Sequence, residues 1–298
     1  MKRIHFTTTL FLTALIAISL AGCTKPRAQL DLNAMSFNIR TGHARDGENH
    51  WDKRKQQLFG LIRKYNPDVI GLQEAHRFQI DEIREALPEY AEIGEGRDGG
   101  KKGEYSAVLY RADRFELSES GTFWLSDTPK VPSTSWGNKY LRICTWGRFI
   151  DKQSGLAFYF YNTHLDHRSQ PSREKAAQLI ADTIQKRTHP DPAILTGDFN
   201  AGESNPAIEY LVERKNAQAP SKPLLVDTFR ALHPDEKTVG TFNGFNGDSD
   251  GDKIDYIFAT PDIQPLEATI IRDNKDGRYP SDHFPISAKL RIVEASGK

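Results

Sequence analysis

Hydrophobic and polar positions follow two different periodic patterns along this chain, and each pattern predicts one kind of secondary structure. Short apolar or alternating runs predict β-strands at 32–39, 68–74, 106–110, 142–149, 156–162, 193–196, 253–259 and 286–293. Apolar residues three or four positions apart predict helices over 51–65, 78–87, 172–187 and 206–213, with Ser172 as the N-cap of the third. Strands outnumber helices, and some are joined as hairpins. The pattern therefore predicts an α/β fold in which two mixed sheets pack face to face with helices outside.

A separate apolar segment precedes this pattern. Lys2 and Arg3 are followed by an apolar run over residues 10–20, which is shorter than the roughly 20 residues of a relaxed membrane span. The run ends in LAGC at 20–23, which resembles a bacterial lipobox with Cys23 as the acylated residue. An ordinary signal peptide or an uncleaved anchor is the alternative. We expect a lipoprotein signal peptide over 1–23, a tether over 24–30, one domain over 31–293, and a lipid-anchored position in a bacterial cell envelope, on the periplasmic or surface side of a membrane.

Charge and cysteine content narrow the classes of partner. Removal of residues 1–23 would leave 38 Lys and Arg against 40 Asp and Glu, because the segment holds two basic residues and no acidic one. A chain with a net charge of −2 has no broad electrostatic footprint for nucleic acid, so any such contact must be local. If Cys23 carries lipid, Cys144 is the only other cysteine, and no intramolecular disulfide is possible.

Six segments share one pattern, in which an apolar run carries or ends in an acid, an amide or an imidazole. They are MSFNIR at 35–40, GLQE at 71–74, NTHLDH at 162–167, GDFN at 197–200, KIDYIF at 253–258 and SDH at 281–283. Any one of them could be a turn or a strand cap. Strands that deliver several such side chains to one place are how a metal-assisted hydrolase presents its chemistry, so together the six predict an active site.

In their order and residue types these six motifs resemble the endonuclease/exonuclease/phosphatase superfamily, which includes deoxyribonucleases, deadenylases, inositol-polyphosphate phosphatases and bacterial sphingomyelinases. The resemblance covers about residues 32–293, and the forms at 162–167 and 173–178 are most similar to the deadenylase-like branch. It implies a four-layer sandwich that hydrolyses phosphoesters with Mg²⁺, or Mn²⁺ as a substitute. We expect the protein to act as a monomer.

The resemblance also implies which residues hold the metal and the phosphate. Glu74 is the expected metal ligand, with Asn38 contributing an amide oxygen or binding through water, and Asp282 as a further ligand, since Mg²⁺ prefers oxygen. Arg142 and Arg173 could each reach a phosphate, and each could equally form a structural ion pair.

The catalytic roles follow in the same way. Asp198 is expected to accept the proton of the attacking water, and Asn200 to orient that water or the phosphate. His283 is expected to pair with Asp255, and the sequence leaves open whether Asp198 or His283 is the general base. His164 is expected to donate to a phosphate oxygen, as an imidazolium that stabilises the transition state.

Three functions fit these motifs to different degrees. The favoured prediction is a phosphodiesterase or nuclease that acts on nucleic acid outside the cytoplasm, either internally or from an end. The alternative is a phosphatase or sphingomyelinase-like phospholipase that acts on small phosphoesters or lipid headgroups, although no amphipathic apolar hairpin for insertion into lipid is evident. A non-catalytic binding module would predict broken motifs, and all six are intact.

Overall fold

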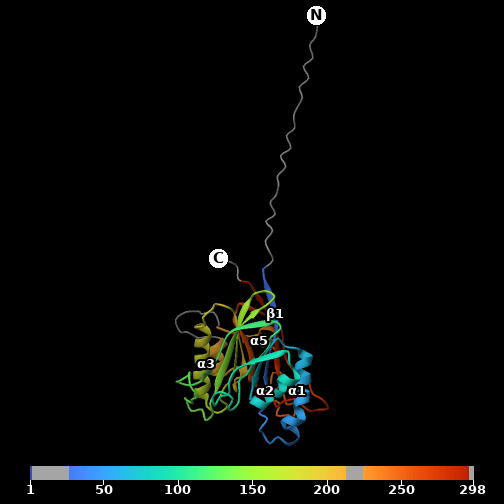
Figure 1. Cartoon of the computed structure of the whole chain (residues 1–298), viewed down its shortest axis with the longest axis vertical. Helices are drawn as coiled ribbons and strands as arrows, with labels where there is room; N and C mark the ends of the chain where they lie inside the picture. Colours follow the sequence, from blue (N-terminus) through green and yellow to red (C-terminus); the bar gives the residue numbers. More distant parts are fainter. Residues whose placement is uncertain (2–26, 213–223, 295–298) are drawn as a thin grey trace.

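The computed structural model of the protein describes residues 1, 27–212 and 224–294 (Figure 1). The predicted signal peptide beyond Met1, its lipobox residue Cys23 and tether positions 24–26 lie outside the described residues. Among the described helices, none combines the length and the apolar character that a membrane crossing needs. Strand β1 spans Gln29–Asn38, and Gln29 pairs with Val293. The last two residues of the predicted tether therefore belong to the domain.

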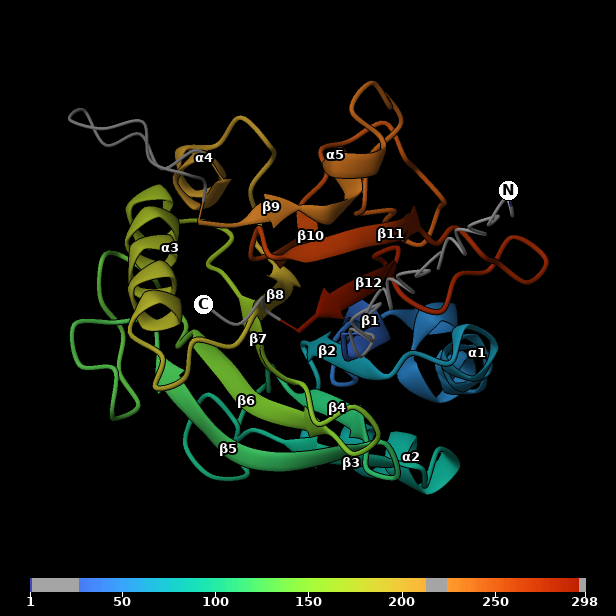
Figure 2. The ribbon, with the colours of Figure 1, turned by 90° about the horizontal axis from the view of Figure 1, so that it is seen from above.

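Twelve strands of the described chain form two mixed six-stranded sheets (Figure 2). The first sheet has the order β11-β12-β1-β2-β4-β3, and the second has the order β5-β6-β7-β8-β10-β9. In the first sheet β1 runs parallel to β2 and antiparallel to β12; in the second, β7 runs parallel to β8 and β10 antiparallel to it. The further strands of the first sheet are β2 (Val69–Gln73), β3 (Tyr90–Ile93), β4 (Val108–Arg111), β11 (Ile263–Ile270) and β12 (Ile286–Val293). Those of the second are β5 (Phe115–Trp124), β6 (Ile143–Asp151), β7 (Ala157–His164), β8 (Ala193–Asp198), β9 (Val226–Asp227) and β10 (Asp255–Ala259).

Helices cover the outer faces of both sheets. Helices α1 (Trp51–Tyr65) and α2 (Arg77–Ala86) lie on the first sheet, and α3 (Gln170–Gln185) and α4 (Pro206–Val212) lie on the second (Figures 1 and 2). A 3₁₀ turn (Gly47–Asn49) precedes α1, and the short α5 (Thr228–Leu232) follows β9. One apolar core fills the space between the sheets, and two others lie beneath the helices. The predicted sandwich of two mixed sheets with helices outside is confirmed.

The third predicted helix begins earlier than its periodicity indicated. Ser169, rather than Ser172, is the N-cap, and its hydroxyl accepts a hydrogen bond from the Ser172 amide at 3.2 Å. Ser172 is buried in the first turn. Two serines stood within a few residues of each other, and Pro171 at the start of the helix favours the earlier one as the cap.

A polar network joins the two sheets beneath the ends of their central strands. The Gln73 side chain donates to Asn162 Oδ1 at 2.7 Å, and Asn162 Nδ2 donates to the Leu72 carbonyl at 2.8 Å. The sheets approach so closely here that a Cβ atom on Gly71 would lie 2.3 Å from Thr196 Oγ1. Glycine at this position and the paired amides therefore hold the carboxyl ends of β2 and β7 side by side.

Candidate active site

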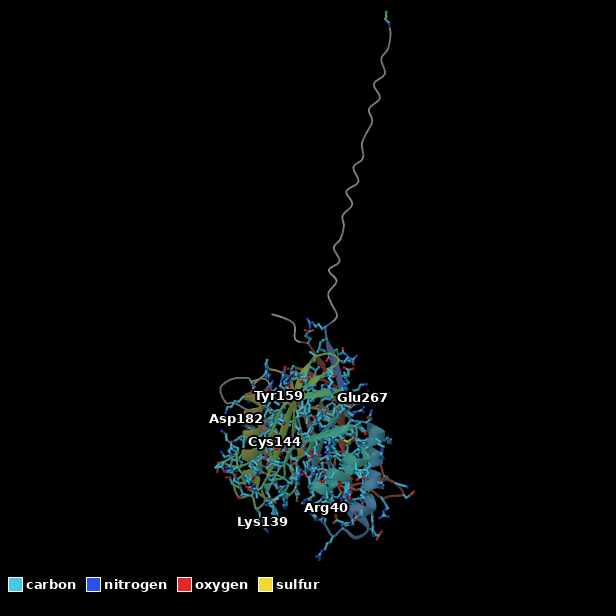
Figure 3. The ribbon with its side chains drawn as sticks, viewed as in Figure 1. Arg40, Lys139, Cys144, Tyr159, Asp182 and Glu267 are labelled. Carbon is cyan, nitrogen blue, oxygen red and sulfur yellow. The ribbon has the colours of Figure 1, made fainter. Side chains whose placement is uncertain are left out.

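The six motifs meet at one end of the sandwich because the parallel pairs β1 and β2, and β7 and β8, end there, while β10 and β12 run in the opposite direction and begin there. Asn38 is the last residue of β1 and pairs with Gln73, so Glu74 follows directly beside it. In the second sheet, Asp198 at the end of β8 pairs with His164 on one side and with Asp255 on the other. Arg40, two residues beyond β1, lies at the opposite end of the molecule from the start of that strand (Figure 3).

Three non-glycine residues of the site adopt left-handed backbone conformations. Arg40, Glu74 and Asn200 have φ angles of 56°, 58° and 48°, and each lies one or two residues beyond the end of a strand. Such conformations cost on the order of 1–3 kcal/mol each and persist where surrounding contacts enforce them. They turn the chain sharply at the strand ends, and all three residues line the cavity described below.

Asp198 is buried at the centre of the site. Its Oδ2 accepts a hydrogen bond from Asn38 Nδ2 at 3.0 Å, and its Oδ1 accepts one from the Asn200 amide at 2.9 Å. Burial, together with the neighbouring Asp255 carboxylate, raises the pKa of Asp198 above the usual range of an aspartate. Its conjugate base is therefore stronger than an ordinary carboxylate, which suits a group that must take a proton from water.

His283 forms the predicted pair with Asp255. Its Nδ1 lies 2.9 Å from Asp255 Oδ2, and its Nε2 lies 3.8 Å from Asp198 Oδ2. Burial alone would lower the pKa of His283, but the charges of Asp255 and Asp198 raise it above the ordinary value. The imidazole is then charged at neutral pH and has no free lone pair. This arrangement favours Asp198 as the proton acceptor.

His164 differs from the prediction in its charge. It is buried, and its Nε2 lies 3.5 Å from Asp198 Oδ2. Burial, reinforced by the positive charges of Arg142 and His283, lowers the pKa of His164 well below its ordinary value. In the free site this pKa favours a neutral imidazole over the expected imidazolium, because burial and two nearby cations oppose a further positive charge. A neutral imidazole still offers one N–H donor to a phosphoryl oxygen.

The half-buried Glu74 and the buried Asp282 give the site carboxylate oxygen ligands for a metal. Glu74 Oε1 and Oε2 accept hydrogen bonds from Asn38 Nδ2 at 3.2 Å and from the Thr41 amide at 3.0 Å. Asp282 lies 3.6 Å from the Arg40 guanidinium, and burial together with the charge of Glu74 raises its pKa. Neighbouring buried carboxylates are stabilised by a divalent cation, and their oxygen atoms fit a hard ion.

Asn38 is not oriented as the predicted oxygen ligand. Its Oδ1 accepts a hydrogen bond from the Arg40 amide at 3.0 Å, so its N–H group faces Glu74 and Asp198. In this orientation Asn38 positions the two carboxylates, and its binding to a metal through water stays a prediction.

A second group could also hold a metal ion by its spacing. One ligand atom each from Asp198, Asp255 and His283 lies within 4.8 Å of the others, and Asp255 Oδ1 is buried without a hydrogen-bond partner. However, His283 Nδ1 already bonds to Asp255, and the imidazole is charged. A metal ligand must be a neutral imidazole, so this group fits a hydrogen-bonded dyad better than a metal site.

The strand ends open into a cavity of about 590 Å³. Its lining includes seven predicted site residues: Glu74, Arg142, His164, Asp198, Asn200, Asp282 and His283. Three further lining residues, Arg40, His167 and Ile254, stand within the six motifs, and five lie outside them: Thr41, Arg97, Glu104, Tyr140 and Phe242. Most of these additional residues come from loops, where no periodic pattern marks a position. The turn-prone glycines around Arg97 and Glu104 were the available signal of a loop near the site.

The two predicted phosphate-binding arginines have different surroundings. Arg142 is buried and lines the cavity, and its Nη2 lies 3.3 Å from His167 Nδ1. Arg173 is absent from the lining; it donates to the Asp166 carbonyl at 2.8 Å and to Gln170 Oε1 at 2.6 Å. Arg173 therefore ties the start of α3 to the preceding loop, and its predicted contact with substrate is not supported.

The sequence matches the model of the Endonuclease/Exonuclease/phosphatase family over residues 35–283. The chain belongs to this family. Its members are metal-dependent phosphoester hydrolases, which is the enzyme class that the six motifs predicted.

Solved structures and curated proteins include several relatives. A family member from Bacteroides thetaiotaomicron is 34% identical with a TM-score of 0.81, covering 89% of this chain and 96% of that one. A mannosyl-6-phosphatase from Bacteroides thetaiotaomicron VPI-5482 is 34% identical with a TM-score of 0.78, covering 87% and 99%. An uncharacterized protein of Acanthamoeba polyphaga mimivirus is 30% identical over 162 residues, or 51% of this chain, and the match spans 60% of that protein's length.

Proposed function

We propose that this family member is a Mg²⁺-dependent phosphatase of small phosphate monoesters, with sugar phosphates as the substrate class. The observation that carries the proposal is the charge balance of the cavity, which suits a single phosphoryl group. It favours the small-phosphoester alternative over the nucleic-acid substrate; the nuclease assignment stays a prediction that the experiment below tests.

Two of the three arginines in the cavity are already paired with carboxylates. Arg40 forms two hydrogen bonds of 3.0 Å with Asp46, and Arg97 donates to Glu104 at 2.6 Å. Arg142 differs, because its buried Nε has no hydrogen-bond partner among the described residues and the Asp166 carboxylate is 4.0 Å away. A nucleic-acid site needs a row of cations for successive phosphates, whereas among the described arginines that line this cavity Arg142 is the one without a close carboxylate partner.

A relative that matches this chain over nearly its whole length supports a monoester substrate. The mannosyl-6-phosphatase shares 34% identity over 87% of this chain, and the match covers 99% of that protein. Its name describes a monoester of a sugar. A cavity of about 590 Å³ also lies within the range of roughly 300–1,000 Å³ that small-molecule sites occupy.

The residues of the site divide the reaction between them. Arg142 and His164 donate to the non-bridging oxygens of the phosphoryl group and fix it in the cavity. Asp198 takes a proton from the attacking water as the new oxygen–phosphorus bond forms. The bond from phosphorus to the sugar oxygen breaks, and that oxygen takes a proton from solvent. A bound Mg²⁺, for which Glu74 and Asp282 are the ligands, would neutralise charge on the phosphoryl oxygens.

We also propose that the protein is anchored to a bacterial envelope membrane through Cys23, with the cavity directed away from the bilayer. Strand β1 has 10 residues and spans about 30 Å from its start to the site. The six chain steps from Cys23 to Gln29 reach at most about 22 Å. The tether is therefore too short for the cavity to turn back onto the anchoring membrane, which favours soluble substrates over lipid headgroups.

Phosphate release from a matched panel tests the proposal. The protein would be incubated in Mg²⁺ or EDTA with mannose 6-phosphate, phenyl phosphate, single-stranded RNA, plasmid DNA and sphingomyelin vesicles, and the products identified by mass spectrometry. We expect Mg²⁺-dependent release of phosphate from the two monoesters. Release of nucleotides with the monoesters untouched would overturn the proposal and support the nuclease prediction; headgroup release would support the phospholipase alternative.

A further inference from the structure

The outer wall of the cavity holds three residues that the reaction does not use. Arg97 and Glu104 lie on the segment between β3 and β4, and Tyr140 precedes β6. All three line the same cavity as Asp198 and His283. They belong to none of the six motifs, and their backbone lies on connecting segments outside the strands. Their position suits contact with the part of the substrate that leaves.

Backbone and side-chain bonds hold Arg97 and Glu104 in fixed positions. The Arg97 amide donates to the Glu104 carbonyl at 2.9 Å, and the Arg97 guanidinium donates to Glu104 Oε2 at 2.6 Å. The Arg97 carbonyl accepts a hydrogen bond from the indole of Trp124 at 2.6 Å. The wall is therefore organised before a substrate arrives, which lowers the entropic cost of binding.

Tyr140 adds an aromatic face to the same wall. Its ring is 38% exposed, lies 5.3 Å from the Arg97 guanidinium and stacks on His167 with ring centroids 6.3 Å apart. His167 in turn contacts Arg142, the arginine proposed to bind the phosphoryl group. The aromatic face is thus connected to the phosphate-binding side of the cavity.

Glu104 contributes a negative charge to this wall of the cavity. Its carboxylate is mostly buried, and the positive charges near it belong to Arg97 and Arg142. Because Glu104 pairs with Arg97, the pair carries no net charge that would attract a second phosphate group on a substrate. A hydroxyl group, by contrast, can donate to the carboxylate and accept from the guanidinium at the same time. The wall therefore fits a neutral group that carries several hydroxyls.

We infer that Arg97, Glu104 and Tyr140 form a leaving-group subsite that selects neutral, polyhydroxylated leaving groups, as in a sugar monophosphate, and rejects leaving groups that carry a second phosphate. This inference rests on the proposed phosphatase function and adds the residues that set its specificity. Glu104 and Arg97 bind the hydroxyls, and the Tyr140 ring packs against the apolar face of the sugar ring.

The test compares substrates that differ only in the leaving group. The full-length protein in Mg²⁺ would be assayed with mannose 6-phosphate, phenyl phosphate and fructose 1,6-bisphosphate, as wild type, Glu104→Gln and Tyr140→Ala. For Glu104→Gln we expect kcat/KM for mannose 6-phosphate to fall at least ten-fold more than that for phenyl phosphate, chiefly through KM. The ratio of bisphosphate to monophosphate turnover should rise. For Tyr140→Ala, KM for mannose 6-phosphate should rise several-fold more than KM for phenyl phosphate.

Glu95→Gln is the matched control, because Glu95 lies on the same segment but is absent from the cavity lining, and it should change none of these ratios. Equal losses on all three substrates in Glu104→Gln would show a structural role and overturn the inference. Wild-type protein that prefers phenyl phosphate to mannose 6-phosphate would overturn it too, while leaving the phosphatase proposal intact. Absence of phosphate release from every monoester would instead refute the proposed function itself.

Discussion

Two cavities of nearly equal volume open on the described part of this protein, and their linings differ in kind. The cavity between α1 and the loop before β12 measures about 600 Å³, and the cavity at the strand ends about 590 Å³. The first is bordered mainly by exposed side chains such as Lys53, Lys64 and Arg278, and Lys64 pairs with Asp273 at the surface. The second contains buried carboxylates and imidazoles with raised or lowered pKa values.

The comparison shows that volume does not identify a site. Burial of titratable groups identifies a site, because the charge of a group that is removed from water depends on its neighbours. Such groups are concentrated where chemistry occurs. Arg54 illustrates the relation between the two cavities. It borders the first, yet its guanidinium donates to the carbonyls of Ile39, Arg40 and Pro280 and so braces the second. Arg54, which borders the first cavity, thus helps to hold the backbone around the second cavity in place.

The largest expected effect comes from the proton acceptor. Asp198→Asn keeps the shape of the side chain and removes its basicity, so kcat should fall by about two to four orders of magnitude. The thermal midpoint should change little, because the substitution removes a carboxylate whose burial is unfavourable. Steady-state kinetics and thermal unfolding check both, with Asp182→Asn on α3 as the control. Near-normal turnover in Asp198→Asn would show that this cavity is not the catalytic one.

Removal of the metal should reduce activity to a similar degree. EDTA should lower phosphate release at least a hundred-fold, and added Mg²⁺ should restore it. Glu74→Gln should raise the Mg²⁺ concentration that gives half-maximal activity, because the variant loses a charged oxygen ligand. Binding of Mg²⁺ measured by calorimetry provides a readout that is independent of turnover. Full activity in EDTA would contradict the metal assignment.

A smaller effect is expected from the arginine that faces the substrate. Arg142→Lys keeps the charge but loses the planar fork of donors, so KM for a phosphomonoester should rise roughly ten-fold with a lesser change in kcat. Arg173→Lys is a matched control, since Arg173 does not line the cavity. Equal changes in KM for the two variants would break the distinction that the structure draws between these arginines.

A shift of the pH profile should follow from the charge of Asp255. This charge raises the pKa of both Asp198 and His283, so Asp255→Asn should lower both. Catalysis needs the deprotonated base, and activity is lost as the pH falls through its pKa. The acidic limb of log kcat/KM against pH should therefore move to lower pH. Asp252→Asn, an exposed change three residues upstream, should leave it in place. A limb that stays fixed in Asp255→Asn would refute the electrostatic coupling.

The smallest effect is expected in the first cavity. Lys53→Ala and Gln57→Ala alter its lining and touch none of the residues at the strand ends. We expect kcat/KM to stay within about two-fold of wild type, as for most surface substitutions. A ten-fold or larger fall in kcat/KM would show that this cavity contributes to catalysis. The functional contrast between the two cavities would then be wrong.

Much of the fold could be predicted from the sequence, and the omissions share a physical cause. Predicted strands correspond to β1, β2, β4, β6, β7, β8, β10 and β12, whereas β3, β5, β9 and β11 were missed. The four missed strands are the four edges of the two sheets. An edge strand has one neighbour and more exposure, so its apolar pattern is weak; β5, for example, alternates between exposed and partly buried residues.

The sequence determined which types of residue are available for the chemistry of this protein. The tertiary structure decided the charge and orientation of each of these residues. Asn38, Glu74, Asp198, Asp255 and His283 could be chosen from the chain because each stands in one of the six motifs whose order and residue types resemble the family. Their charges and orientations could not, since these depend on neighbours that are remote in the chain. Burial, reinforced by Arg142, lowers the pKa of His164, the Arg40 amide turns the N–H group of Asn38 inward, and Glu104 neutralises Arg97. A pattern of residues fixes which groups are available, and only the folded chain decides which groups lose water and which partners they meet.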